Sequence, residues 1–276
     1  MGKTTDTTAR KGRVTIKDVA SAADVSIATV SYVLNNKPGQ SISEETRKKV
    51  FQFANLLGYE CNVMARYLAT GKTNTVAVVV KNVEGIGSAY YIKLITELTR
   101  LFAEHNRALR VCDYTAELER TGAPCDAYIT LGLSEQDFRM FADTKYVPVV
   151  AIDTVFEDLL FYRINDDFAA MYQAAKKELP DCEEITLLTH PLPEECLAGA
   201  EKVFDGVTVI RSLRDLPTEL SGTGYATQSR FIADFLHCPV FCAKNSFELK
   251  ASAAVEAVNK AIGRVDSSAA EHNIEI

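Results

Sequence analysis

The 276-residue sequence contains no tryptophan and no long apolar segment. Because a helix needs about 18 to 20 consecutive apolar residues to cross a bilayer, no membrane span is expected. The seven cysteines are an odd number without a C-x-x-C pair, which disfavours a disulfide framework. The N-terminal MGKTTDTTARKGR has no apolar stretch behind its basic residues, so no export signal is expected. We therefore expect a cytoplasmic protein with reduced thiols.

Signatures of common enzyme classes are also missing. Gly85-Ile86-Gly87 follows an apolar strand pattern but lacks the third glycine of a dinucleotide-binding fingerprint, and no Walker sequence occurs. There is no nucleophile elbow, no H-E-x-x-H and no cysteine/histidine spacing suited to a metal. The acidic cluster at 181–184 is typical of a solvated surface. Catalysis, a metal and a cofactor are therefore not expected.

Charge is divided unevenly along the chain. Residues 1–74 carry eleven Lys and Arg against six Asp and Glu, a net charge of +5. The remaining residues carry 19 against 31, a net charge of -12. Each Lys or Arg that meets a phosphate releases condensed counterions, so the first part suits a polyanion that the second part would repel. Charge alone does not distinguish DNA from RNA or a membrane surface.

Two short helices are predicted in the stretch VTIKDVASAADVSIATVSYVLNN at residues 14–36. Thr15 and Asp18 have the spacing of a capping box, which begins the first helix. Asp24 lies in the break that follows, where a left-handed turn is tolerated. Ser26 can cap the second helix through a backbone amide of its first turn. The pattern predicts a helix-turn-helix.

The second helix has two faces at about 100° per residue. Val30, Val33 and Leu34 fall together and can bury against the first helix. The residues expected to face outward are Ile27, Ala28, Ser31, Tyr32 and Asn35. A third helix is predicted over 44–57, and three short helices around one core make a domain of roughly fifty residues. The major groove of DNA, about 12 Å wide, admits one such helix.

A further short helix is predicted at 62–69, before a linker at 70–74. So short a helix is marginal alone in water, so another group must hold it. From residue 75 apolar strand patterns alternate with helical ones, which indicates a doubly wound α/β fold. The strands are expected at 76–80, 108–112, 127–131, 147–152, 185–188, 207–210 and 240–242, and the helices at 88–105, 135–142, 167–178, 227–236 and 247–262.

Residues 14 to 80 resemble the N-terminal region of the lactose/galactose repressor (LacI/GalR) family of bacterial transcription regulators. The elements T-I-K-D-V-A, V-S-I-A-T-V-S-Y-V-L-N, S-E-E-T-R and A-R-Y-L follow one another in the family's order. The resemblance implies a repressor that binds a pseudopalindromic operator in double-stranded DNA as a homodimer. Its second helix would enter the major groove at each half-site.

The resemblance also implies roles for single residues. The implied base contacts are Ile27, Ala28 and Tyr32, and the groups that position the DNA backbone are Ser26, Thr29, Ser31 and Asn35. A hinge that orders on DNA and opens the minor groove is implied for Asn62, Ala65, Arg66 and Leu68. The alternatives are that Ile27 packs against the domain's own edge, that Tyr32 only covers surface, and that Leu68 belongs to a core.

The implied organisation has a flexible basic arm at 1–13, the helix-turn-helix domain at 14–61, the hinge and linker at 62–74, and a shortened regulatory or dimerisation domain at 75–276. This α/β body resembles periplasmic sugar-binding proteins, which implies a small, sugar-like effector between two lobes, near Tyr90, Tyr91 and Asp166. Helix capping and surface packing are the alternatives for these three residues.

The body departs from the family's pattern in several places. The segment after Asp113 is too short for the family's second helix, and no arginine follows the strand at 185–188. The customary Gly-Phe-Asp-Asp strand end is missing, and Cys61 replaces the proline usual before the hinge. A body that binds no effector and only dimerises or binds a protein partner is therefore the alternative within the class. The alternative from another class is a sugar- or nucleoside-processing enzyme with a DNA-binding head.

Overall fold

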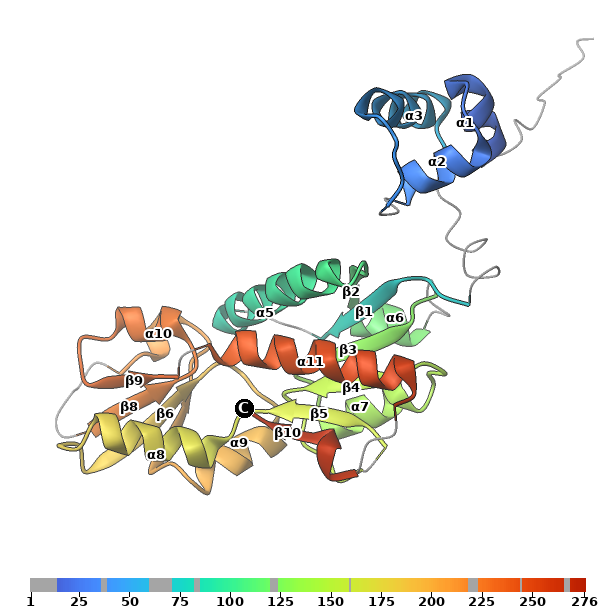
Figure 1. The fold of residues 1–276 in the computed structure, drawn as a ribbon. Coiled ribbons are helices and arrows are strands. Elements are labelled where there is room, and N and C mark those ends of the chain that lie inside the picture. Colours follow the sequence, from blue (N-terminus) through green and yellow to red (C-terminus); the bar gives the residue numbers. More distant parts are fainter. Residues whose placement is uncertain are drawn as a thin grey trace, which may run out of the picture. The chain divides into compact units, whose positions relative to one another are not determined.

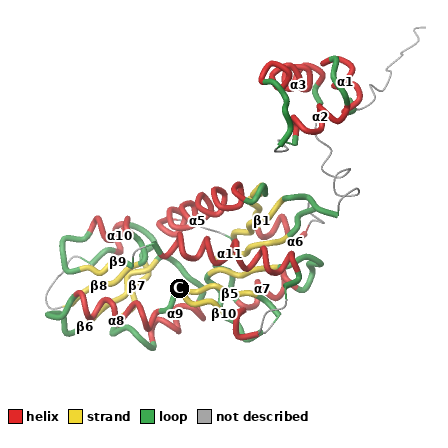
Figure 2. Tube along the Cα trace, in the orientation of Figure 1, coloured by secondary structure: helices red, strands yellow, loops and turns green. Residues whose placement is uncertain are grey.

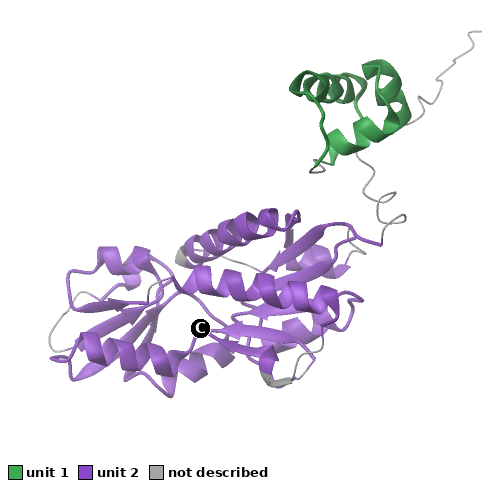
Figure 3. Cartoon of the chain, viewed as in Figure 1, with its two compact units in different colours: residues 1–66 green, residues 67–276 purple. Residues whose placement is uncertain are grey.

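The computed structural model describes residues 14–35, 39–59, 71–81, 85–119, 124–158, 160–217, 223–243, 245–265 and 269–276. The chain divides into two compact units, residues 1–66 and 67–276, each with its own core (Figure 3). We call them the head and the body. The expected basic arm at 1–13 lies outside the described residues. Among the helices that are described, none combines the length and apolar character needed to cross a membrane.

The head consists of three helices, α1 (Ile16–Ala23), α2 (Ile27–Leu34) and α3 (Glu44–Leu57). At the start of α1 the carboxylate of Asp18 accepts hydrogen bonds from the backbone amide and hydroxyl of Thr15, at 2.7 and 2.8 Å. The helix ends at Asp24, whose φ of 54° is the left-handed conformation expected of it. These local signals confirm the predicted helix-turn-helix.

The core of the head is small and entirely local. Its buried members come from all three helices: Val19, Ala20, Ala23, Val30, Val33, Val50 and Ala54. The hydroxyl of Ser43 caps α3 by accepting a hydrogen bond from the amide of Thr46, at 3.1 Å, and Gly58 ends it with a φ of 68°. Burial of one stripe on each helix leaves the other face of α2 exposed to solvent.

The body has two lobes, and the six-stranded lobe contains a wholly parallel sheet. Its strands lie in the order β10 (Asn273–Glu275), β5 (Tyr162–Asn165), β4 (Val149–Ile152), β3 (Ala127–Leu131), β1 (Thr75–Val80) and β2 (Ala108–Asp113). Helices α5 (Gly85–Glu104) and α11 (Ser246–Gly263) lie side by side on one face (Figure 1). The other face is covered by α6 (Tyr114–Glu119) and α7 (Glu135–Ala142).

The four-stranded lobe is also parallel, with the order β7 (Gly206–Val209), β6 (Glu184–Thr189), β8 (Thr223–Thr227) and β9 (Val240–Cys242). On one side it packs against α8 (Phe168–Glu178) and α9 (Glu194–Glu201), and on the other against α10 (Arg230–Phe235). The chain crosses between the lobes after β5 and again after β9. Figure 2 shows the alternation of strands and helices that produces both sheets.

Most predicted elements of the body are confirmed. An apolar run such as Val76–Val79 predicts a strand covered on both faces, and these four residues are fully buried in β1. One boundary was wrong. The helix expected from Thr227 begins at Arg230, since Thr227 is the last residue of β8. The segment after Asp113, expected to be too short for the family's second helix, holds the six-residue α6. The pattern also missed β5, α9, β8 and β10.

Candidate functional site

The outward face of α2 is the candidate DNA-reading surface. Ile27 is 46% exposed and Ala28 is exposed as well, whereas Val30 and Val33 on the opposite face are completely buried. Tyr32 is half-buried. A large apolar side chain in the first turn of a helix, left to solvent by its own domain, is available for contact with thymine methyl groups. The structure places these residues as expected, and their contacts with bases stay predictions.

The polar residues around α2 fix the ends of the helix. The hydroxyl of Ser26 accepts a hydrogen bond from the amide of Thr29 at 3.0 Å, and the hydroxyls of these two residues are 2.9 Å apart. At the other end the side-chain amide of Asn35 donates to the carbonyl of Ser31 at 2.7 Å. A helix N-terminus with ordered hydroxyls favours phosphate, so the predicted backbone contacts remain predictions with a physical basis.

The predicted hinge is the remaining expectation for the N-terminal part of the chain. The hinge residues Asn62, Ala65, Arg66 and Leu68 lie outside the described residues. Helix α2 itself carries no Lys or Arg. Direct reading by this helix would therefore depend on apolar contacts and the Tyr32 hydroxyl rather than on bidentate contacts to guanine.

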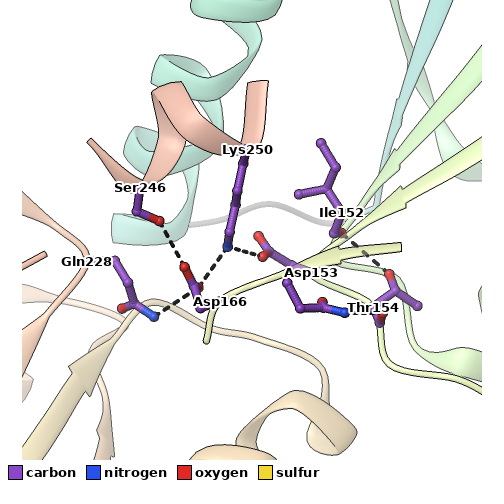
Figure 4. Close-up of polar contacts among 8 residues, drawn as sticks. Ile152, Asp153, Thr154, Asp166, Gln228, Ser246 and Lys250 are labelled. Atoms are coloured by element: carbon purple, nitrogen blue, oxygen red, sulfur yellow. Dashed lines mark hydrogen bonds and ion pairs between the residues drawn. The ribbon is translucent and has the colours of Figure 1, made fainter. Parts of the chain in front are cut away.

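In the body, a buried ionic cluster lies where the two lobes meet (Figure 4). The ammonium group of Lys250 forms ion pairs with Asp153 and with Asp166, the latter at 2.7 Å between Nζ and Oδ2. Asp166 also accepts hydrogen bonds from the Ser246 hydroxyl at 2.9 Å and the Gln228 amide at 3.2 Å. The Lys250 side chain has no exposed surface. We call these five residues the lysine cluster.

Burial and charge act in opposite directions within the lysine cluster. Burial by itself lowers the pKa of Lys250, but the carboxylates of Asp153 and Asp166 outweigh it and hold the pKa well above its ordinary value. Burial raises the pKa of Asp153, against the opposing effect of the Lys250 charge. The lysine is therefore charged at neutral pH, and its two acidic partners are what make that charge tolerable in the interior.

Three aromatic side chains lie beside the lysine cluster. The imidazole of His190, directly after β6, stacks on Tyr90 with the ring centroids 4.1 Å apart and meets Tyr91 edge-on at 5.4 Å. Both tyrosines belong to α5, so the stack joins the two lobes. The Lys250 Nζ lies 5.6 Å from the Tyr90 centroid. Gly132 leaves room for Tyr91, because a Cβ there would lie 2.3 Å from the tyrosine hydroxyl.

His190 is held neutral. Burial, reinforced by the charge of Lys250, lowers the pKa of His190 from 6.5 to about 3, and neither ring nitrogen has a hydrogen-bond partner in the described part of the chain. Above pH 6.5 the ring is neutral in both the folded and unfolded states. As the pH falls below 6.5 the unfolded state takes up a proton that the folded state refuses, so stability is lost.

We expect His190 to lower the free energy of unfolding by about 2 kcal/mol when the pH falls from 7 to 5. His190→Phe keeps an aromatic ring against Tyr90 and removes the proton site, so its pH dependence should be weaker by that amount. Urea unfolding at the two pH values measures the difference. His105→Gln, at an exposed histidine elsewhere in the body, is the control. An identical pH dependence in His190→Phe and the wild type would contradict the assignment.

The structure brings together the three residues predicted near an effector, but their groups face one another. Asp166 is bonded within the lysine cluster, Tyr90 contacts both Lys250 and His190, and Tyr91 contacts the same histidine. Their contact with an effector stays a prediction. Three pockets border these residues: one of about 450 Å³ lined by Tyr90, one of about 600 Å³ lined by Tyr91, and one of about 250 Å³ lined by Asp166.

Four residues of this site, Asp153, His190, Gln228 and Lys250, were not predicted from the sequence. A signal was present for Lys250, because it lies on the apolar stripe of α11 with Ala251, Ala254 and Val258, where a charged residue needs a buried partner. Asp153 and His190 directly follow apolar strands, Asp153 at the carboxyl end of the six-stranded sheet and His190 at that of the four-stranded sheet, where ligands of such folds commonly bind. Nothing in the sequence indicated which of these residues would meet.

Residues 15–62 match the family of bacterial regulatory proteins described as the lacI family. HTH-type transcriptional regulator RegA of Clostridium acetobutylicum is 32% identical over 149 residues, which cover 50% of this chain and 43% of that protein. Catabolite control protein A of Staphylococcus aureus is 31% identical over 206 residues, covering 71% of this chain and 61% of that one. The chain thus spans less than two thirds of either relative.

Solved structures share the fold across both units. The lac repressor dimer bound to operator and the anti-inducer ONPF superimposes with a TM-score of 0.56 at 17% identity, covering 96% of each chain. A LacI family regulator from Silicibacter pomeroyi gives 0.57 at 18% identity, covering 95% of this chain and 96% of that one. The head and the body together define a helix-turn-helix protein with a periplasmic-binding-protein-like body. The chain belongs to the lacI family of bacterial regulatory proteins.

Proposed function

We propose that the protein is a sequence-specific DNA-binding transcription regulator that acts as a repressor on a pseudopalindromic operator. The observation that carries this proposal is the exposed face of α2, where Ile27 and Ala28 face solvent while Val30 and Val33 anchor the helix in the head. A helix held in this way can lie in the major groove with its first turn against base edges. DNA binding, rather than catalysis, is the proposed activity.

The proposed assembly is a homodimer. Two heads would bind two half-sites about 34 Å apart, and Ser26, Thr29, Ser31 and Asn35 would position the DNA backbone. The hinge residues Asn62, Ala65, Arg66 and Leu68 would order on the DNA, with Leu68 opening the minor groove and adding specificity through deformation. A dimer bound in this way blocks a promoter sterically. Because the bacterial chromosome lies in the cytoplasm, the proposed location of the protein is cytoplasmic.

For the body, we propose a small-molecule effector, with the two pockets beside Tyr90 and Tyr91 as its possible locations, since pockets of 300 to 1,000 Å³ suit small ligands. A second candidate is a body that works without an effector and serves for dimerisation or a protein partner. The engagement of Asp166 and Tyr90 by Lys250 favours this second candidate. Calorimetry of the full chain with sugars and nucleosides distinguishes the two, because only the first predicts saturable heat.

Tyr32→Ala is expected to relax base preference at one position in each half-site, because the variant loses the only aromatic hydroxyl of α2. One lost base contact is worth about 1 kcal/mol or more of discrimination, so the preferred base should lose roughly tenfold in selectivity. Selection of binding sites from a randomised half-site measures this change. Tyr146→Ala removes a fully exposed tyrosine of the body and is the control. An unchanged selection profile for Tyr32→Ala would rule out the reading role.

Genome-wide mapping of binding sites tests the proposed function as a whole. We expect a limited set of inverted-repeat sites near promoters, with expression of the neighbouring genes rising when the protein is deleted. Sites scattered without a shared sequence would refute specific DNA binding. Genes that fall in expression after deletion would refute the repressor assignment and leave the DNA-binding assignment standing.

A further inference from the structure

The side chain of Lys250 occupies the junction of the two lobes of the body. It comes from α11, which packs on the six-stranded sheet, yet its partners lie on other segments. Asp153 follows β4, and Asp166 lies between β5 and α8, where the chain first crosses to the four-stranded lobe. A fully buried ammonium group has lost its hydration, and here the two carboxylates replace it. Lys250 thus fixes the end of β5 relative to α11.

Asp166 is bonded from both lobes. Its Oδ2 accepts from Lys250 at 2.7 Å and from the side-chain amide of Gln228, directly after β8 in the four-stranded lobe, at 3.2 Å. Its Oδ1 accepts from the hydroxyl of Ser246, the first residue of α11 after the second crossing, at 2.9 Å. Figure 4 shows these groups converging on one carboxylate. A hinge motion that separates the lobes must break at least one of these bonds.

The aromatic stack adds a second connection across the same boundary. His190 of the four-stranded lobe lies against Tyr90 and Tyr91 of the six-stranded lobe, and all three side chains are at least nine-tenths buried. The ammonium group of Lys250 lies over the ring of Tyr90, with Nζ 5.6 Å from the ring centroid. The centre of the cleft between the lobes is therefore filled by side chains of the chain itself.

We propose that Lys250 is a built-in substitute for a cleft ligand, holding the two lobes closed when no small molecule is bound. A ligand closes a two-lobed protein by bonding to both lobes at once, and Lys250 makes these bonds internally through Asp166. The body rests in the closed arrangement, and a molecule at the centre of the cleft must first displace these side chains. The closed state of the lobes does not depend on the proposed regulatory function. Only an effect of closure on operator affinity rests on that function.

Hydrogen exchange of the full chain, measured without added ligand, tests the proposal. Lys250→Met removes the ammonium group and keeps much of the side chain's apolar volume. The matched control is Lys260→Met, on the same helix, whose partner Glu256 forms an exposed i,i+4 pair. Gln228→Ala removes one bond between the lobes and leaves the ion pairs in place, so it remains informative if Lys250→Met folds poorly.

In the wild type we expect slow exchange in the segments 162–168, 186–192 and 245–250, which hold the crossings and the stack. Lys250→Met should raise exchange there by at least about tenfold, and Gln228→Ala by less, while the strands β1 and β3 keep their wild-type rates. Lys260→Met should match the wild type in every segment. Adding D-glucose or D-galactose to the wild type should leave the three segments unchanged.

Four results would overturn the proposal. They are fast exchange of the three segments in the wild type, wild-type rates in both cluster variants, a uniform rise over the whole body, and further protection of the three segments by either sugar. Operator affinity is measured on the same samples by fluorescence anisotropy. A wild-type chain that binds no DNA while its segments exchange slowly refutes the regulatory function and leaves the closed body intact, so the two failures are distinguishable.

Discussion

A chain that lacks residues 1–66 is expected to lose operator binding by at least about a thousandfold, the lower range by which specific binding exceeds nonspecific binding. The head carries the exposed face of α2, and residues 1–66 hold ten Lys and Arg against six Asp and Glu, a net charge of +4. Residues 67–276 hold 20 Lys and Arg against 31 Asp and Glu, a net charge of -11, so the truncated protein is repelled by phosphate. Nonspecific binding should therefore disappear together with specific binding.

The truncated protein should otherwise remain folded. The hydrophobic clusters of both lobes lie wholly within the body, so its thermal unfolding transition should match the body transition of the full chain. A mobility shift retained by this truncated protein would show that the body itself binds DNA. Loss of the thermal transition would show that the two units do not fold independently.

Val30→Asp is expected to unfold the head and abolish specific DNA binding, with an affinity loss of at least about a hundredfold. The side chain of Val30 has no exposed surface and lies in a core of seven buried residues. An unpaired carboxylate costs several kcal/mol in such a place, and a domain of this size has only about 3 to 5 kcal/mol of stability. The cost therefore equals or exceeds the whole stability of the head.

Circular dichroism and DNA titration together measure this effect. Gln52→Asp introduces the same charge on an exposed position of α3 and should leave both the helix signal and operator affinity near wild type. In Val30→Asp the body transition should persist while the helix signal of the head is lost. Tight and specific operator binding by Val30→Asp would mean that the folded head is not the DNA-binding unit.

The head could be predicted from sequence because its determinants are local. The Thr15–Asp18 pair, the left-handed Asp24 and the Ser26 cap each act within four residues of where they stand in the chain. The exposed Ile27 and buried Val30 follow from helical periodicity alone. What lies outside the described residues, the hinge above all, is left as a prediction from the family resemblance.

Elements of the body could be predicted only where a buried position requires an apolar residue. β1, buried on both faces, appears as an apolar run, whereas β8, with the sequence TGYAT, is rich in small and polar residues and was taken in part for a helix. Strand β10 has only three residues at the sheet edge, too few for an alternation to appear. Edge strands are often short and carry charged residues, as β10 does with Glu275, so they give little apolar signal.

The lysine cluster could not be predicted because it depends on long-range placement. Lys250 lies 97 residues from Asp153 and 84 from Asp166 in the chain. The two sheets bring these segments together through two crossings whose geometry no local pattern records. Tyr90 and Asp166 are predicted near an effector, and their contacts with Lys250 in the folded protein could not be foreseen.

Selection of binding sites from a random DNA library, with the full-length protein, tests the central claim most directly. The proposed dimer of heads predicts an enriched inverted repeat whose two half-sites are centred about one helical turn, or roughly 10 base pairs, apart. Variants of Ile27, Ala28 or Tyr32 should each change the consensus at matching positions of both halves. Enrichment of no sequence, or of a single site without a second half, would contradict the assignment of α2 as the reading helix of a dimeric DNA-binding regulator.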